Sequence, residues 1–152
     1  MERKNTQVRD LAEIERQLTE AQTGVLSIHL DTEKIMQIAC NFIYLDKNIY
    51  LYLDKNDENF EHIKYGAIGS FSVFSNENIG SKNKNYSYRI FYITVDGEIK
   101  DIDDSKLFDQ VTELYRKKYS PSIKSDEYKV SEYLKPVILD SKEIKSVLEE
   151  GI

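Results

Sequence analysis

The stretch Phe42-Ile43-Tyr44-Leu45-Asp46-Lys47-Asn48-Ile49-Tyr50-Leu51 decides the fold class of this 152-residue chain. Its β-branched and aromatic residues favour strands, and they stand on both sides of a polar triplet that is typical of a tight turn. The stretch therefore predicts an antiparallel hairpin, with one strand over residues 35–45 and the next over residues 49–53.

Strand patterns continue on both sides of this hairpin. Upstream, Leu26, Ile28 and Leu30 alternate with other residues, as they do in a strand with one buried face. Downstream, residues 75–85 form a polar loop between two strands, and Asp96-Gly97 marks a turn or bulge. The predicted strands are six: residues 24–30, 35–45, 49–53, 67–74, 86–95 and 136–139.

Three segments have helical patterns instead. In residues 8–21 the apolar positions recur at spacings of three and four, which predicts an amphipathic helix. Residues 103–118 form a second helix with acids at its start and bases at its end, in the order that the helix dipole favours. Residues 57–65 predict a short helix of two turns closed by Gly66. From Ser141 onward, Ile144, Val147 and Leu148 fit a short helix, and this end of the chain stays ambiguous.

Composition excludes several classes of function. The formal charge is −6, with 27 acidic against 21 Lys and Arg residues, so duplex nucleic acid is not an expected partner. Cys40 is the single cysteine, which excludes a disulfide framework and a thiolate zinc cluster and predicts a buried side chain. No apolar run approaches ~18 residues, and we expect a soluble cytoplasmic protein without membrane contact.

The order of these elements resembles the flavin-binding split-barrel family that contains pyridoxamine 5'-phosphate oxidase. The stretches that carry the resemblance are GVLSI (24–28), FIYLDKNIYL (42–51), HIKYGAIGSF (62–71), VDGEIKDI (95–102) and KKYSP (117–121). The resemblance runs from about Leu11 to about Leu148. It implies one domain over 1–152, with a helical segment over about 7–22 and a six-stranded antiparallel split β-barrel of the FMN-binding type over about 24–140.

The resemblance also implies a homodimer with two equivalent clefts, each holding one flavin between the subunits. The second strand would face the flavin ring with backbone groups, while the third strand and the short helix would pass the phosphate. Arg89, with Lys82 and Lys84, could reach the cleft from the partner as one way of supplying positive charge to the phosphate. The residues assigned in this way to cofactor binding are Ala39, Cys40, Asn41, Phe42, Leu53, Asp54, Lys55, Asn59, Lys64 and Arg89.

Asn59 departs from the family pattern, because many members place Lys, Arg or His on the phosphate at this position. A neutral amide lacks the charge that strengthens hydrogen bonds to phosphate. The acids around it are Asp54, Asp57, Glu58 and Glu61. Lys55 and Lys64, or cations of the partner, could compensate, so flavin binding and loss of the phosphate site both stay open.

No catalytic residue can be assigned. The 6 glycines are scattered, and the chain has no nucleophile elbow, phosphate-cradling loop or metal-binding helix motif. We expect His29 and His62 to be surface or capping residues and not metal ligands, and we expect Asp103 and Asp104 to cap a helix. The tyrosines of the hairpin, Tyr44, Tyr50 and Tyr52, fit strand packing or a dimer interface.

Two hypotheses of function follow. The first is an FMN-binding oxidoreductase that acts on an unidentified small molecule, since flavin itself carries the redox chemistry and needs few catalytic residues. The second is a split-barrel protein without catalytic activity, or one that binds haem or another ligand after losing the flavin phosphate site.

Overall fold

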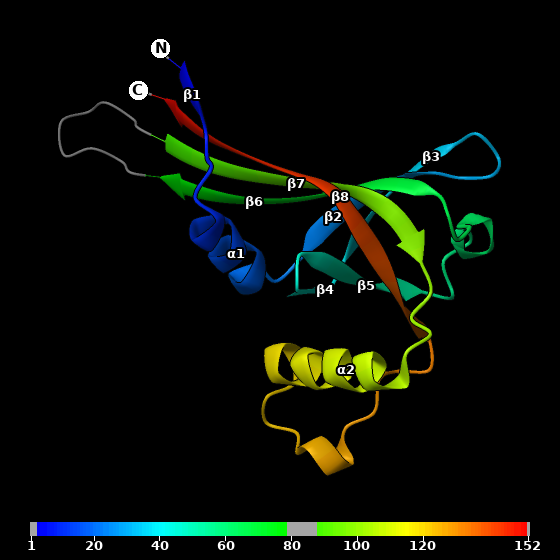
Figure 1. Cartoon of the computed structure of the whole chain (residues 1–152). Coiled ribbons are helices and arrows are strands. Elements are labelled where there is room, and N and C mark those ends of the chain that lie inside the picture. Colours follow the sequence, from blue (N-terminus) through cyan, green and yellow to red (C-terminus); the bar gives the residue numbers. More distant parts are fainter. Residues whose placement is uncertain (1–2, 79–87, 152) are drawn as a thin grey trace.

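The computed structural model describes residues 3–78 and 88–151 and shows one curled antiparallel sheet flanked by two α-helices (Figure 1). The helices are α1, Leu11–Glu20, and α2, Ser105–Tyr119, and two 3-10 turns are η1, Phe60–His62, and η2, Ser125–Glu127. The strands of this described part are β1, Arg3–Gln7; β2, Gly24–His29; β3, Ile35–Cys40; β4, Phe42–Leu45; β5, Asn48–Asp54; β6, Ile68–Asn78; β7, Tyr88–Lys100; and β8, Leu134–Gly151. The chain is mainly β with flanking helices, as predicted.

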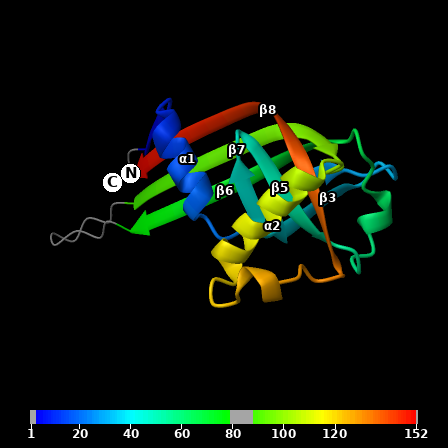
Figure 2. The ribbon, with the colours of Figure 1, turned by 60° about the horizontal axis from the view of Figure 1, so that its bottom comes forward.

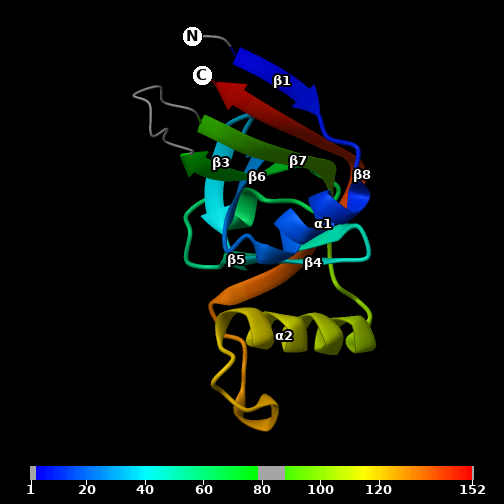
Figure 3. The same ribbon diagram turned by 90° about the vertical axis from the view of Figure 1, so that its left-hand side faces the viewer.

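The sheet curls so that its first and last strands are neighbours in sequence. Hydrogen bonds join the strands in the order β3-β2-β6-β7-β8-β5-β4, and β1 pairs separately with the end of β8. Strands β3 and β4 are separated by Asn41 alone, and the backbone N–H of Tyr52 in β5 donates to the Asn41 carbonyl at 3.2 Å. The view in Figure 3 shows β3 and β4 on opposite sides of the curl.

We predicted six strands, and the described residues form eight. One difference is that the strand predicted over residues 35–45 breaks at Asn41 into β3 and β4. The other difference is β1, whose five residues are polar and exposed, so the sequence has no alternating apolar pattern that would predict a strand there. Backbone pairing with β8, from Arg3 opposite Gly151 to Gln7 opposite Val147, holds β1 in place.

Strands β6 and β7 form a long ladder. Strand β6 continues to Asn78, so the start of the loop predicted over residues 75–85 belongs to the sheet; the rest of that loop lies outside the described residues. Strand β7 runs through Asp96 and Gly97, where the register against β8 shifts, and the predicted bulge is confirmed. A Cβ atom at Gly97 would overlap the carbonyl of Asp140, so this crossing requires glycine.

Strand β8 is 18 residues long, and the helix considered over residues 141–148 is wrong. Ile144 and Leu148 pack against the main core, whereas Val147 lies opposite Tyr92 on the other side of the sheet. The ladder with β7 on one side and with β1 on the other stabilises the extended form. This pairing involves distant residues, which a local helical spacing does not reveal.

Two apolar cores lie on opposite faces of the hairpin β4–β5. The main core contains Ile14 and Leu18 of α1 against the inner face of the sheet, including Phe42 and Phe71. The second core lies between α2 and the opposite face of β4 and β5, and it contains Ile43, Tyr50, Tyr52, Val111 and Tyr115. Figure 2 shows α1 and α2 in these separate positions. The hairpin is therefore covered on both faces.

The two long helices are confirmed, each with an aspartate at its N-cap. Asp10 accepts from the N–H of Ala12 at 3.1 Å, and Asp104 accepts from Lys106 at 2.9 Å and Leu107 at 3.4 Å. The capping role predicted for Asp104 is thus observed.

The short helix predicted over residues 57–65 is wrong, because only the single turn η1 forms there. Ile63 already has an extended backbone and packs against the main core. Gly66 has φ of +92°, but its N–H donates to the carbonyl of Ile99 at 2.7 Å, so it directs the chain into the sheet and caps no helix.

Cys40 is buried and forms no disulfide, in agreement with its prediction as a small core residue. Burial raises the pKa of its thiol to about 12. Neither α1 nor α2 combines the length and the apolar character that crossing a bilayer requires.

Candidate functional site

The junction between β3 and β4 contains four of the residues that the resemblance assigns to the flavin ring. Ala39 is exposed on β3, whereas Cys40 and Phe42 are buried in the main core on either side of Asn41. The side-chain amide of Asn41 donates to the hydroxyl of Tyr115 in α2 at 3.2 Å. Of the four side chains, that of Ala39 is therefore the one open to a ligand.

The backbone N–H and carbonyl of Phe42 form hydrogen bonds with side chains at the end of α2. Its N–H donates to the Tyr119 hydroxyl at 3.0 Å, and its carbonyl accepts from Lys118 Nζ at 3.0 Å. The Tyr119 hydroxyl also donates to the carbonyl of Gln22 at 2.6 Å and lies 3.1 Å from the Phe42 carbonyl. Backbone contact with a flavin, predicted for residues 39–42, would thus have to come from the part of this segment that precedes Phe42.

The end of β5 and η1 hold the second group of candidates. Leu53 is buried, and the carboxylate of Asp54 accepts from the N–H of Asn56 at 2.8 Å. The backbone N–H of Lys55 donates to the Tyr133 carbonyl at 2.8 Å, and its side chain is exposed. Asn59 is half-buried, and its N–H donates to the carboxylate of Asp57 at 2.8 Å. The two aspartates stabilise local turns here, and Lys55 supplies the cation of this segment.

Lys64 already contacts one backbone carbonyl and one carboxylate. Its Nζ donates to the carbonyl of Glu61 at 3.0 Å and lies 3.6 Å from the carboxylate of Asp31. The same carboxylate is 2.8 Å from Nδ1 of His62, whose Nε2 lies 3.6 Å from Glu61. Asp31 therefore joins the β2–β3 loop to η1 and offsets part of the positive charge available to a phosphate.

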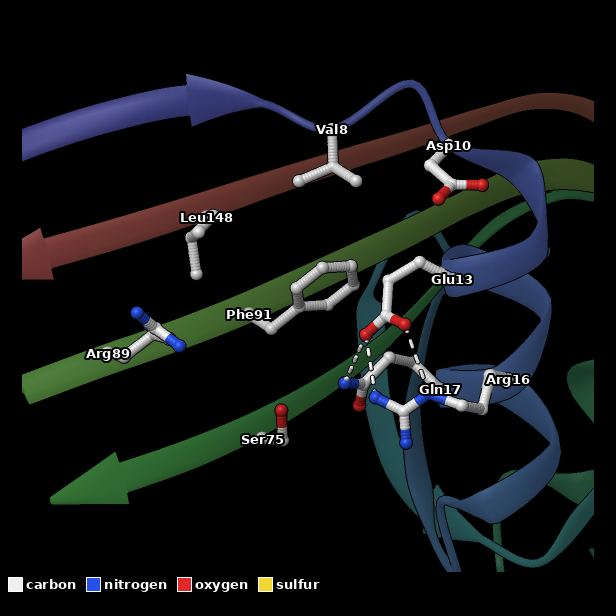
Figure 4. A pocket seen from close by; sticks show the side chains of 9 residues that line it. All are labelled: Val8, Asp10, Glu13, Arg16, Gln17, Ser75, Arg89, Phe91 and Leu148. Carbon is white, nitrogen blue, oxygen red and sulfur yellow. Dashed lines mark hydrogen bonds and ion pairs between the residues drawn. The ribbon is translucent and has the colours of Figure 1, made fainter. Parts of the chain in front are cut away.

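Arg89 lies in a different place, in a pocket of about 430 Å³ between α1 and the inner face of the sheet (Figure 4). Arg89 pairs weakly with Glu150 at 3.5 Å, and Arg16 of α1 pairs with Glu13 at 2.7 Å. Val8, Phe91 and Leu148 form the apolar part of this pocket. Our sequence reasoning missed the α1 side of the pocket, because the charged positions of an amphipathic helix usually face solvent.

Among residues 3–78 and 88–151, no helix covers the outer face of the sheet over β2, β3, β6 and β7 (Figure 1). Ala39, Val25, Ser72 and Thr94 form one row across this face, since each lies opposite the next in the ladder. Four large apolar side chains are exposed on the same face: Ile35 at 67%, Ile68 at 63%, Phe74 at 65% and Tyr92 at 38%. We call this surface the outer face.

The tyrosines and histidines are placed largely as predicted. Tyr50 and Tyr52 are buried against α2, which confirms strand packing, and Tyr44 donates to Glu15 of α1 at 2.9 Å. His29 is exposed at the end of β2. Residues 3–78 and 88–151 contain no group of three or more His, Cys, Asp or Glu side chains placed to hold a metal ion.

No family model matches this sequence, and no curated protein matches it either. Solved structures do match. A provisionally assigned 5-nitroimidazole antibiotic resistance protein from Bacteroides thetaiotaomicron superposes with a TM-score of 0.75 at 15% identity, over 99% of this chain and 90% of the other. This chain has the split-barrel fold.

Two further split-barrel structures agree. The FAD and haem binding protein from Mycobacterium smegmatis gives a TM-score of 0.68 at 12% identity, over 92% of this chain and 71% of the other. A provisionally assigned pyridoxamine 5'-phosphate oxidase from Corynebacterium glutamicum gives 0.60 at 12% identity, over 95% and 98%. At these identities the likeness is one of fold, and the resemblance in the sequence is confirmed at that level.

Within one split-barrel chain, the predicted residues do not form a single site. Asp54 lies opposite Leu134 at the start of β8, and Arg89 lies opposite Glu150 near its end. At about 3.3 Å per residue, these positions are roughly 50 Å apart along the strand. The groups at β3–β4 and β5–η1 are neighbours through the curl of the sheet, whereas Arg89 belongs to the pocket beside α1.

Proposed function

We propose that this chain forms a homodimer through its outer face and binds a flavin there, with FMN as the cofactor. The observation that supports this proposal is an uncovered sheet face with exposed Ile35, Ile68, Phe74 and Tyr92 that also carries Ala39. Large apolar side chains gathered on one open face favour contact with a partner surface. A flavin ring next to Ala39 would then lie between two subunits. The known split-barrel protein that binds FAD and haem has the same fold.

The residues present suit the ring better than the phosphate. Ala39 leaves space on the outer face, since its side chain is small and exposed. At the phosphate position, Asn59 is neutral, Lys64 is close to Asp31, and Lys55 carries the remaining charge of its segment. We infer that Lys55 and Asn59 contact the phosphate, and that a partner subunit supplies further positive charge.

A bound flavin would supply hydride or electron transfer, which makes an oxidoreductase acting on a small molecule the proposed activity. The chain's own residues would bind and orient the ring and exclude water from it. Phe42 and Phe71, in edge contact at 4.8 Å between ring centroids, form a rigid core directly behind the β3–β4 junction. That rigidity would keep the ring-binding backbone in place.

The first experiment is titration of the purified protein with FMN and with riboflavin, followed by quenching of flavin fluorescence. We expect saturable quenching, and an FMN affinity within about tenfold of that for riboflavin, because the phosphate gains little charge stabilisation here. Ala39→Glu should abolish binding, and Ala12→Glu, on the exposed side of α1, should leave it unchanged. No quenching by either flavin would refute the proposal.

Dimer formation is measured separately, by light scattering during gel filtration. We expect the mass of two chains for the wild type, and a shift to one chain for the double variant Ile68→Asp, Phe74→Asp. A monomeric wild type would refute the dimer, whatever the flavin titration shows.

The second candidate function is haem binding, and His62 is the residue that favours it. Asp31 contacts its Nδ1 at 2.8 Å, as carboxylates commonly contact the histidine ligands of metals, and a haem iron would have to displace Glu61 from its 3.6 Å contact with Nε2. Haemin titration followed at the Soret band tests this candidate. His62→Ala should remove the binding and His29→Ala should not; equal binding by both variants would exclude this site.

A further inference from the structure

Lys118 is a partly buried cation near the C-terminal end of α2. Its Nζ donates to the Phe42 carbonyl at 3.0 Å and lies 4.0 Å from the centroid of the Phe42 ring. The ring of Tyr119 is the next aromatic group, at 5.2 Å. Within the described part of the chain, no carboxylate lies within salt-bridge distance of this ammonium group. A carbonyl dipole and aromatic faces thus stabilise the charge, without a counter-ion.

The side chain of Lys118 also lines a pocket of about 280 Å³ between α1, β4 and α2. The other lining residues are Thr19 of α1, Ile43 and Tyr44 of β4, and Leu114 and Lys117 of α2. The walls are therefore largely apolar, and the charged residues among them are both lysines. This combination of apolar walls with positive charge is typical of sites for organic anions.

Burial of an ammonium group without a counter-ion is unfavourable, because the group loses hydration that nothing of opposite charge replaces. Desolvation accordingly lowers the pKa of Lys118 to about 8. A bound anion would restore the missing charge, and the apolar walls would bury the rest of the ligand. The same ligand thus satisfies both features of the pocket.

We propose that this pocket binds a small organic anion with an apolar body, whose carboxylate contacts the ammonium group of Lys118. The site is separate from the outer face, and the proposal does not depend on flavin binding. The volume suits a ligand of the size of a single aromatic ring with its acid group.

The neighbouring tyrosines and the cysteine stay protonated over the pH range in which Lys118 loses its proton, so they do not complicate the pH dependence of anion binding. Burial raises the pKa of Tyr44 on β4 and of Tyr119 on α2 to about 12, and that of Cys40 at the end of β3 to about 12. The carboxylate of Glu15 on α1 accepts from the Tyr44 hydroxyl at 2.9 Å, and Lys117 lies on the exposed side of α2. A change of anion affinity between pH 7 and 10 therefore reports on Lys118.

The test compares benzoate with benzamide, which has nearly the same shape and no charge, by NMR titration of the labelled full chain. At pH 7 we expect benzoate to bind at least about tenfold more tightly, as one charge-assisted hydrogen bond provides. The preference should decline above pH 8 as Lys118 loses its proton, and be largely gone at pH 10. Equal binding of the two probes at pH 7 would overturn the proposal.

Two variants locate the contact. Lys118→Met keeps the apolar stem and removes the charge, so it should abolish the preference for benzoate while benzamide binding persists. Lys106→Met is the control, since Lys106 is an exposed lysine at the start of α2 that does not line the pocket, and it should leave the preference unchanged. The Lys118→Met protein should unfold at an equal or higher denaturant concentration than the wild type, which shows that it is folded. A retained benzoate preference in Lys118→Met would refute the assignment.

Discussion

The hydroxyl of Tyr119 joins three segments at the β3–β4 junction, and its removal is the sharpest test of the fold. In Tyr119→Phe, the N–H of buried Phe42 loses its acceptor at 3.0 Å, and the Gln22 carbonyl loses its donor at 2.6 Å. An unsatisfied buried N–H costs about 1–3 kcal/mol, whereas the Gln22 carbonyl lies in a more exposed segment and can bind water. We therefore expect the free energy of unfolding to fall by about 2 kcal/mol.

Urea unfolding followed by far-ultraviolet circular dichroism measures this loss. With the slope usual for a small domain, the midpoint should fall by about 1 M, and the melting temperature by about 4–8 °C. Tyr133→Phe is the matched control, since that side chain is 55% exposed, and it should change stability by less than about 0.5 kcal/mol. Equal stability of the two variants would refute the role given to the Tyr119 hydroxyl.

Four further outcomes follow from the structure. Phe71→Ala should lower the free energy of unfolding by about 3–5 kcal/mol in urea, because Phe71 is fully buried in the main core; a loss below 1 kcal/mol would contradict that packing. Gly97→Ala should lower it by more than about 2 kcal/mol, since its Cβ would overlap the backbone of Asp140, and an unchanged midpoint would exclude the close crossing. The thiol of Cys40 should stay unreactive toward a disulfide reagent in the folded protein and react at once in denaturant, so rapid reaction of the native protein would argue against its burial. The pKa values of Tyr44 and Tyr119 are about 12 in the folded state, against about 10 in the unfolded chain, so the unfolded chain loses these protons first as the pH rises. The stability that these groups contribute is therefore intact below pH 10 and falls toward pH 12. Urea unfolding midpoints measured at pH 9, 10 and 11 should show this fall, and a constant midpoint would contradict it.

The candidate site was predictable only in part. The family resemblance implied that residues 39–42 and 53–59 lie along one flavin, and the curl of the sheet does bring these segments together at the hydrogen bond between Tyr52 and Asn41. The sequence could not show that side chains of α2 form hydrogen bonds with the backbone of Phe42, or that Asp31 pairs with Lys64, because these contacts join residues far apart in the chain. Whether residues 39–42, 53–55, 59, 64 and 89 bind a cofactor stays a prediction.

The sequence by itself determined the class of this protein and most of its elements. The period of two in β2, the strand-forming residues around the turn of the β4–β5 hairpin, and the spacing of three and four in α1 and α2 are local properties, and a local pattern can predict them. The capping aspartate Asp104 is also readable, because the N–H groups that it accepts from lie within three residues. The turn-forming pair Asp96-Gly97 marks the bulge in the sequence, although the glycine itself is required by the distant backbone of Asp140. Only the tertiary structure decided β1, the continuation of β8 and the single turn at η1. In each of these, hydrogen bonds or core contacts with distant strands outweigh the local preference, and no window of sequence contains the partners that make them stable.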